Sequence, residues 1–337
     1  MTQRNEFIDS LGAVRDADGT ALHLGTPAER LPADAALLCD HLAVLRVRGE
    51  ESEKFLQGQL TADVRDVSAG LTRLAMHLSL KGRGIASMRL LPAEGGHDLI
   101  VPASQEPILR ESLGKYIVFS KAEIEADPDR MVLSLEGERA PEVLTAAGLP
   151  VPGAAHSCAH AEEITIARGC AAARWLLILP VSHAAVLWPT LSKGLHTGAA
   201  QHARLAEIAA GEAHVLPETR ERFMPQDLNY DITDGVSFEK GCYTGQEVVA
   251  RMHHKGKLKQ RMRHISWEGE QAPEPGTVLR NEQGKAAGEI ANAVVCGKYI
   301  HALAVLRLDH EGDCLIDETP LGIQREALPY EGKLDGG

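Results

Sequence analysis

Strand-like runs in this chain come in pairs, and the best-defined pair is joined by only four residues. Apolar runs at 74–80 and 85–91 flank the sequence KGRG at 81–84. Two glycines in four residues favour a tight hairpin between antiparallel strands. Helical patterns separate this pair from other strand-like runs at 41–47 and 131–135. Pairs of strands with intervening helices predict an α+β fold with antiparallel sheets, and not one doubly wound parallel sheet.

The character of the chain changes after Gly256, where short strands predominate. Strand-like runs at 277–280, 289–295 and 301–308 predict a small β-barrel or sandwich. Because 337 residues exceed the usual size of one domain, we expect more than one. The predicted organisation is an α+β region over 1–254, a β-domain over 255–330 and a frayed tail over 331–337.

Composition limits the classes of protein that the chain can belong to. Its net charge of −12 argues against a surface that binds nucleic acid everywhere, but leaves room for a local basic patch. The most apolar stretch, 171–188, is interrupted by Arg174 and Pro180, so we expect a buried strand that leads into a helix and not a membrane span. The six cysteines include no C-x-x-C pair, and the first residues show no apolar core of a secretory signal. These features predict a cytoplasmic protein with reduced thiols and no bound metal.

A cysteine stands just before a predicted helix in the sequence FEKGCYTGQEVVAR at 238–251. Thr244 can cap this helix, and Glu247 three residues later can complete a capping box. Cys242 then lies beside the positive end of the helix dipole and two residues from Lys240, and both would favour the thiolate. We therefore expect a lowered pKa for the Cys242 thiol, with Cys242 and Lys240 as the candidate catalytic residues. The alternative is a buried cysteine that acts as a small hydrophobic residue.

The segment FMPQDLNYD at 223–231 combines aromatic, thioether and carboxamide groups in a stretch with little periodicity. Such a loop can stack on a flat heterocycle through Phe223 and hydrogen-bond to its edge through Gln226 or Asn229. Ordinary loop packing is the alternative interpretation.

Five cations alternate with other residues between 255 and 263. If this stretch is a strand, all five lie on one face, where they would repel one another unless they are solvated or face an anion. A solvated strand face is the ordinary interpretation, and RNA phosphate, an acidic partner or an anionic ligand are the functional ones. The residues are Lys255, Lys257, Lys259, Arg261 and Arg263.

Several separated motifs resemble one family. KGCYTGQE at 240–247, preceded by FMPQDLNYDITDGVSF at 223–238, resembles the defining motif of the YgfZ-type folate-binding proteins, which are relatives of the glycine-cleavage T-protein. FLQGQLTADV at 55–64 and ARMHHKGKLKQRMR at 250–263 resemble other parts of the same group. The resemblance implies a T-protein-like three-domain ring around a tetrahydrofolate-binding hole. Two intertwined antiparallel-sheet α+β subdomains would form residues 1–254, and a β-barrel would form the C-terminal part.

The resemblance also implies a function. The family assists the assembly or repair of iron–sulfur clusters, including those of tRNA-thiolating enzymes, so assembly proteins or client enzymes are the expected partners, and no membrane is. Cys242 would act as the thiolate, and tetrahydrofolate would be the cofactor. The residues expected to contact the folate are Phe223, Gln226, Asn229, Tyr243, Gln246 and Glu247.

The chain departs from the T-protein pattern at two carboxylates. T-proteins carry an aspartate after a Gly-Ile pair in the second hairpin strand, whereas Ala86, Ser87 and Met88 follow that pair here. The T-protein glutamate that holds the pterin corresponds to Ala209, and Glu207 lies at a different helical angle. These losses disfavour the alternative of a folate-dependent aminomethyltransferase or demethylase. A third interpretation, an RNA-binding module that uses the basic stretch, stays open.

Overall fold

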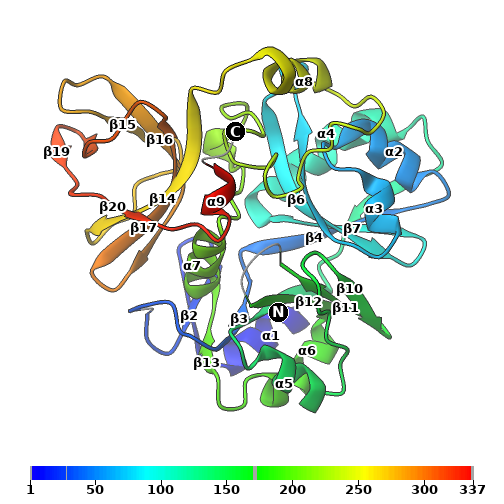
Figure 1. Ribbon diagram of the computed structural model, residues 1–337. Coiled ribbons are helices and arrows are strands. Elements are labelled where there is room, and N and C mark those ends of the chain that lie inside the picture. Colours follow the sequence, from blue (N-terminus) through cyan, green and yellow to red (C-terminus); the bar gives the residue numbers. More distant parts are fainter. Residues whose placement is uncertain (1, 28, 170–172, 335–337) are drawn as a thin grey trace. The chain divides into compact units, whose positions relative to one another are not determined.

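The computed structural model describes residues 2–27, 29–169 and 173–334, and the chain divides into two compact units. Each unit takes three separate stretches, so the two alternate along the sequence. The first consists of Met1–Phe55, Val64–Arg73 and Arg89–Ala206, and the second of Leu56–Asp63, Leu74–Met88 and Glu207–Gly337. Helices and mostly antiparallel sheets make up both units (Figure 1), as the sequence predicted. None of the helices in the described parts of the chain has the length and hydrophobicity needed to span a bilayer.

A six-stranded sheet forms much of the first unit, in the order β10-β11-β12-β9-β3-β13. Its neighbouring strands are antiparallel, except that β13 pairs with β3 in parallel. The strands are β3 (Ala35–Leu38), β9 (Arg130–Glu136), β10 (Cys158–Ala161), β11 (Ile164–Arg168), β12 (Arg174–Pro180) and β13 (His196–Gly198). Successive residues of a strand point to opposite faces, and in β9 both Val132 and Leu133 are buried. The sheet is therefore covered on both sides, which explains its continuous apolar runs.

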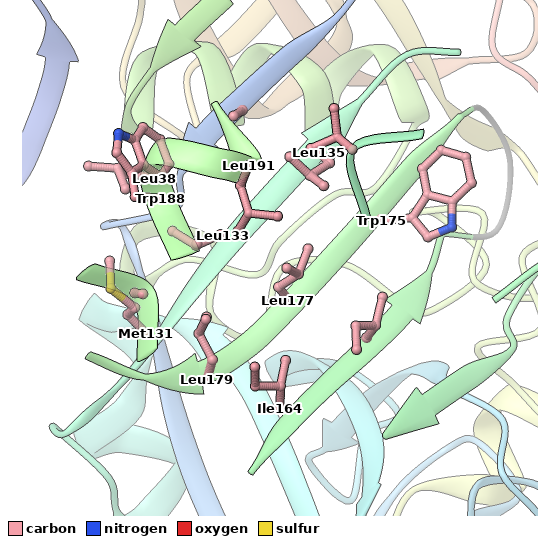
Figure 2. Close-up of a cluster of buried hydrophobic side chains, with 14 of the residues drawn as sticks. Leu38, Met131, Leu133, Leu135, Ile164, Trp175, Leu177, Leu179, Trp188 and Leu191 are labelled. Atoms are coloured by element: carbon pink, nitrogen blue, oxygen red, sulfur yellow. The ribbon is translucent and has the colours of Figure 1, made fainter. Parts of the chain in front are cut away.

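Helices cover one face of this sheet and build the larger core of the unit with it. Figure 2 shows how Trp175, Leu177 and Leu179 of β12 lie with Trp188 and Leu191 in one cluster of buried side chains. The last two belong to α6, which follows β12 directly, so the predicted strand that leads into a helix is confirmed; residues 171 and 172 of that prediction lie outside the described part. The helices that contribute to the cluster are α1 (Gln3–Ser10), α5 (Ala140–Ala146) and α6 (Val181–Leu191).

The opposite face of the sheet packs on a second antiparallel sheet. Val44 and Ile100 of the second sheet form a buried cluster with Leu37, Val132 and Leu176 of the first. Within this unit the order is the C-terminal half of β6, then β7, β4 and β8. The elements are β4 (Leu42–Arg48), β7 (Gly96–Pro102), β8 (Glu123–Ala126), α3 (Val64–Ser68), the 3₁₀ turn η1 (Ala103–Gln105) and α4 (Glu106–Ile117).

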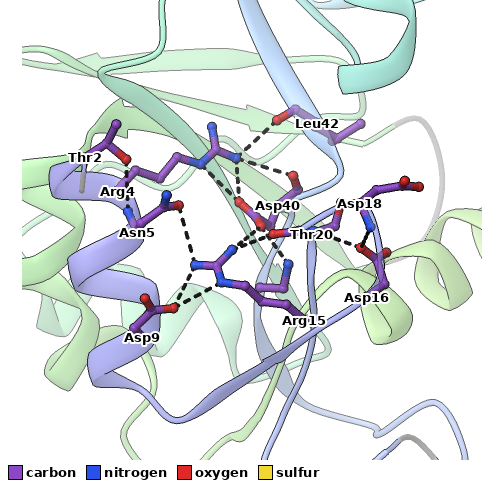
Figure 3. Close-up of polar contacts among 12 residues, drawn as sticks. Thr2, Arg4, Asn5, Asp9, Arg15, Asp16, Asp18, Thr20, Asp40 and Leu42 are labelled. Carbon is purple, nitrogen blue, oxygen red and sulfur yellow. Dashed lines mark hydrogen bonds and ion pairs between the residues drawn. The ribbon is translucent and has the colours of Figure 1, made fainter.

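One buried carboxylate ties the start of the chain to the first sheet. Asp40 accepts hydrogen bonds from Arg4 Nε and Nη2 at 3.0 and 2.8 Å and from the Ala21 backbone amide at 2.7 Å (Figure 3). Arg15 Nη1 lies 3.7 Å from its other oxygen. Asp40 therefore links α1 and the small hairpin of β1 (Ala13–Arg15) and β2 (Ala21–Leu24) to the end of β3.

Most of the predicted hairpin belongs to the second unit, and the structure confirms this hairpin. Its strands are β5 (Arg73–Leu78) and β6 (Gly84–Ala93), and the first unit takes over at Arg89 within β6. The turn closes through a hydrogen bond of 2.8 Å from Ser79 N to Arg83 O. Gly82 has φ +70°, a conformation that glycine adopts without the strain of a side chain.

A curled, seven-stranded antiparallel sheet forms the C-terminal half-barrel, where the sequence predicted a β-barrel or sandwich. Its order is β19-β18-β15-β16-β17-β14-β20. Ile265, Ile290 and Leu306 are among the residues of its core. Part of the predicted frayed tail forms the short helix α9 (Glu331–Leu334), and residues 335–337 lie outside the described part. The strands are β14 (Gln260–Glu268), β15 (Val278–Arg280), β16 (Ala286–Cys296), β17 (Tyr299–Arg307), β18 (Leu315–Ile316), β19 (Thr319–Pro320) and β20 (Gln324–Glu326).

The predicted basic strand face at 255–263 is wrong. Lys255 is the last residue of helix α8 (Gln246–Lys255), and β14 begins only at Gln260. Arg261 is buried in an ion pair with Asp231, and Arg263 pairs with Glu331. Lys257 and Lys259, in the connection between the helix and the strand, are exposed. The five alternating cations therefore do not lie on one strand. They are distributed over the end of a helix, a connection and the start of a strand.

Two histidines on neighbouring strands of the half-barrel make stability depend on pH. His264 Nε2 lies 3.1 Å from His301 Nδ1. Burial, and then the neighbouring His301, lowers the pKa of His264 to about 4, and burial lowers the pKa of His301 despite the opposing charge of Glu326. A neutral pair can share one proton, whereas two cations in this place would repel each other.

Because the folded state holds fewer protons than the unfolded state between the two pKa values, stability rises with pH across this window. We expect His264 to contribute about 2–3 kcal/mol that is present above pH 6.5 and is lost as the pH falls toward 4. Urea unfolding at pH 4.5, 5.5 and 7 measures this slope, and His264→Gln should flatten it. An equal slope in the wild type and the variant would contradict the assignment.

Candidate functional site

The segment before α8 is held close to the turn of the β5–β6 hairpin. Gly245 precedes the helix with φ +83°, and a Cβ there would lie 2.6 Å from the carbonyl oxygen of Ser79. A Cβ on Gly82 would likewise lie 2.9 Å from the Cβ of Val248. Two glycines thus allow the hairpin turn and the start of the helix to approach each other, which larger residues would prevent.

The predicted capping box is wrong for the same reason. Gly245, and not Thr244, is the N-cap of α8, and glycine has no side chain with which to accept a capping bond. Thr244 instead donates its backbone amide to the Gly58 carbonyl at 3.2 Å. Glu247 stays in the first turn, where its charge still favours the helix dipole.

Cys242 is the exposed thiol among the five cysteines that the structure describes. Cys39 and Cys296 are buried. Burial raises the pKa of Cys158 to about 12 and the pKa of Cys314 to about 11, so these two thiols stay protonated at neutral pH. Among the thiols that the structure describes, Cys242 is therefore the most accessible to a partner or reagent.

The side chains of Lys240 and Tyr243, on either side of this thiol in the sequence, anchor the backbone in the interior. Lys240 is buried, and its ammonium donates to the carbonyl oxygens of Leu60 at 2.8 Å and Ala62 at 2.7 Å. Tyr243 is buried, its ring centroid lies 5.1 Å from Lys240 Nζ, and burial raises the pKa of its phenol to about 12. The chain therefore exposes Cys242 between two fixed side chains. A catalytic role for Lys240 stays a prediction.

The three loop residues predicted to contact folate are nearly fully buried. Gln226 donates through Nε2 to the carbonyl of Val249 in α8 at 2.9 Å. Asn229, in the left-handed conformation at φ +62°, donates to the Met262 carbonyl of β14 at 3.0 Å. Phe223 is 3 % exposed. These bonds tie the loop to both the helix and the half-barrel, and a role of the three residues in ligand binding stays a prediction.

Other predicted contacts lie nearer the surface. Gln246 is half-buried and Glu247 is exposed, both in the first turn of α8. With Cys242 and Tyr243 they form a continuous segment that starts at the anchored Lys240. The structure therefore brings these residues together, and their contact with folate stays a prediction as well.

Ser87 is a neutral side chain in the stretch where the resemblance to T-proteins would place an aspartate. Ser87 is fully buried, and its hydroxyl accepts a hydrogen bond of 2.8 Å from the Val215 amide. Glu207, in α7 (Ala200–Ala210), is buried with its carboxylate 3.5 Å from His214 Nε2. The Ser87 hydroxyl therefore has a structural role here as the acceptor for this amide.

The sequence interpretation missed two acidic residues of the loop. Asp231 forms the buried ion pair with Arg261, and Asp227 accepts a hydrogen bond of 2.8 Å from the Met224 amide. Burial raises the pKa of Asp227 against the opposing hydrogen bond from Met224. Asp227 stands three residues after Met224, which is a local spacing that favours such a turn and could have identified it.

The fold defines the class of protein. The crystal structure of the glycine cleavage system aminomethyltransferase T from Bartonella henselae matches with a TM-score of 0.77, over 98% of this chain and 97% of that one. At 18% identity this match concerns the fold, and it confirms the predicted T-protein-like architecture. The helices and sheets described above are therefore those of a T-protein fold.

Relatives in sequence define the family. The tRNA-modifying protein YgfZ of Sodalis glossinidius is 30% identical over 315 residues, which are 91% of this chain and 96% of the relative. The protein of the same name from Klebsiella pneumoniae (strain 342) is 30% identical over 308 residues, 89% of this chain and 94% of the relative. No protein-family model matches the chain. The chain belongs to the family of the tRNA-modifying protein YgfZ.

Proposed function

We propose that the protein is a folate-binding accessory of tRNA modification that serves iron–sulfur enzymes through the sulfur of Cys242. The observation that carries the proposal is the exposure of Cys242 between the buried side chains of Lys240 and Tyr243. A fixed and accessible thiol suits contact with a cluster or with a partner protein. The names of the sequence relatives supply the link to tRNA modification.

The site supports an accessory protein better than an aminomethyltransferase. Transfer of a one-carbon unit needs a group that can exchange a proton with the folate amine. Ala86, Ser87 and Met88 follow the Gly-Ile pair after which T-proteins carry the aspartate, and the neutral Ser87 hydroxyl accepts a hydrogen bond from the Val215 amide. Ala209 carries no functional group where T-proteins place the glutamate that holds the pterin. Both losses disfavour transferase chemistry and support a binding function.

One polar atom of the loop supports a role in binding tetrahydrofolate. Gln226 Oε1 is buried and, among the described residues, has no hydrogen-bond partner, whereas its Nε2 is fixed by Val249. A buried acceptor without a partner is costly, and an N–H of a pterin edge would satisfy it. Stacking of the ligand on Phe223 would require the nearly buried ring of this residue to become accessible. A bound tetrahydrofolate would supply a hydrogen-bonding heterocycle and a nitrogen that accepts one-carbon units.

The residues of the chain would present the thiol to a cluster as cargo. Cysteine sulfur is the ligand that iron–sulfur clusters prefer. The two hydrogen bonds of Lys240 hold the backbone on one side of Cys242, and the buried ring of Tyr243 holds it on the other. Gly245 allows α8 to start immediately afterwards. The thiol is thus positioned by its neighbours and can contact an iron without a rearrangement of the fold.

Replacing Cys242 with serine tests the proposal. In cells that lack the endogenous protein, we expect Cys242→Ser to lower the fraction of thiolated tRNA at least tenfold relative to the wild type. The half-buried Cys158 provides the matched control, and Cys158→Ser should preserve thiolation. Thermal unfolding and calorimetric titration with tetrahydrofolate should give equal results for Cys242→Ser and the wild type. Full thiolation with Cys242→Ser would remove the thiol from the mechanism.

A further inference from the structure

Four exposed cations gather on the end of α8 and on the connection that follows it. They are Arg251, Lys255, Lys257 and Lys259, and among the described residues none of them forms an ion pair. The sequence from 248 to 267 contains no aspartate or glutamate, although the whole chain carries a net charge of −12. We call these four residues the basic patch. Its four charges are therefore concentrated locally and form no ion pair among the described residues, although Glu247 precedes Arg251 by one helical turn.

Some exposed lysines elsewhere in the protein pair with acids. Lys54 lies 3.0 Å from Glu51, and Lys298 lies 2.7 Å from Glu268. In the basic patch, by contrast, Arg251 and Lys255 are four residues apart on one helix, a spacing at which like charges destabilise the helix. A cluster that repels itself is favourable when an anion lies across it.

An aromatic stack joins the same helix to the segment that precedes it. Phe238 and His253 are stacked with ring centroids 3.7 Å apart and planes 13° apart, and His254 meets His253 edge-on at 4.9 Å. Phe238 is half-buried, whereas His253 is exposed. The phenylalanine thus supports a flat ring at the surface, within one turn of Lys255. Cations that contact phosphates and aromatic rings that stack on bases are the two elements of single-strand recognition.

We propose that the basic patch and the Phe238–His253 stack bind single-stranded RNA, such as a tRNA loop. Arg251, Lys255, Lys257 and Lys259 contact the phosphates, and an unpaired base stacks on His253. The inference deepens the proposed function, on which it rests, because it assigns the surface that meets the tRNA. An acidic protein would match the charge of the basic patch, but its carboxylates would not stack on the ring of His253 as an unpaired base would.

The direct test is the salt dependence of binding to an unmodified tRNA transcript. Four phosphate contacts on a single strand give a slope of about −3 in log affinity against log salt, or roughly a 50-fold loss between 50 and 200 mM KCl. Fluorescence anisotropy with a labelled transcript measures both quantities. We expect K257Q/K259Q to halve the slope. The control K193Q/K285Q removes two exposed lysines from other places and should leave the slope unchanged.

The aromatic stack is tested separately from the charges. Phe238→Leu should weaken binding about tenfold at every salt concentration, because loss of stacking does not change the number of phosphate contacts. Phe238→Tyr keeps a supporting ring and should preserve affinity, which excludes a general folding defect. A base-paired RNA without a loop should compete poorly.

The outcomes separate this inference from the role of Cys242. The proposed RNA surface is wrong if the transcript does not bind, or if an acidic protein competes while a second transcript does not. It is also wrong if K257Q/K259Q and K193Q/K285Q change the salt slope equally. Cys242→Ser should bind the transcript as tightly as the wild type. If Cys242→Ser loses thiolation and the wild type does not bind RNA, the role of the thiol is supported and RNA binding by the basic patch is refuted. If the wild type binds RNA tightly and in a salt-dependent way while Cys242→Ser keeps full thiolation, RNA binding by the basic patch is supported and the role of the thiol is refuted.

Discussion

Replacing Arg261 with methionine should lower the free energy of unfolding by about 3–5 kcal/mol, because it leaves a buried carboxylate without its partner. Arg261 Nη1 and Nη2 each donate to Asp231 at 2.9 Å, and both side chains are about nine-tenths buried. The guanidinium also donates to the Gln226 carbonyl at 3.2 Å. One side chain of β14 therefore holds the loop that contains the predicted folate contacts.

Urea unfolding at pH 7 gives the size of the loss. Arg263→Met is the matched control on the same strand, because its partner Glu331 is 38 % exposed, and we expect it to cost no more than about 1 kcal/mol. The double variant of Arg261→Met with Asp231→Leu should recover much of the loss, since it removes both buried charges. Equal losses for Arg261→Met and Arg263→Met would show that the buried pair has no special weight.

The misplacement of Arg261 shows where sequence patterns fail. The alternation of cations from Lys255 to Arg263 satisfies a strand with one basic face, and it was interpreted in that way. Helix α8 continues to Lys255 and β14 starts at Gln260, so the alternation crosses from one element to the next. The partner of Arg261 is thirty residues earlier, in a loop with little periodicity. Periodicity describes one element at a time and cannot report such a pairing.

Local patterns succeeded where local chemistry decides the structure. The hairpin turn at 81–84 follows from two glycines in four residues, and Gly82 has φ +70° in the structure. The start of α8 was missed because Gly245 is required by its distance from the Ser79 carbonyl, which belongs to the hairpin. The side chain of Thr244 suits an N-cap better than glycine does. The close approach of Gly245 to the Ser79 carbonyl nevertheless places the N-cap at Gly245.

The candidate site shows the same division. The motif around Cys242 correctly predicted a cysteine before a helix, and the structure adds that the thiol is exposed. The destination of Lys240 could not be predicted, because the carbonyls that bind it belong to Leu60 and Ala62, about 180 residues earlier. Sequence reasoning placed its charge beside the thiol, whereas the structure directs its ammonium to those carbonyls.

Lys240→Met should therefore lower the free energy of unfolding by about 2–4 kcal/mol, because two buried carbonyls lose a charged donor and the methionine offers none. The side chain of methionine has a similar length, so the loss reports the hydrogen bonds and not a large cavity. Lys257→Met is the control, since Lys257 is exposed and should change stability by less than about 0.5 kcal/mol. Urea unfolding compares the two variants with the wild type.

The same variant separates a positioning role of Lys240 from a chemical one. In conditions where Lys240→Met stays folded, the rate of alkylation of Cys242 by iodoacetamide reports the chemistry of the thiol itself. If Lys240 only positions the backbone, stability falls while the alkylation rate and its pH profile stay as in the wild type. If the ammonium acts on the sulfur directly, the pH profile moves as well. If Lys240→Met keeps the stability of the wild type but changes the pH profile of Cys242 alkylation, the two hydrogen bonds to the carbonyls do not explain why Lys240 is buried.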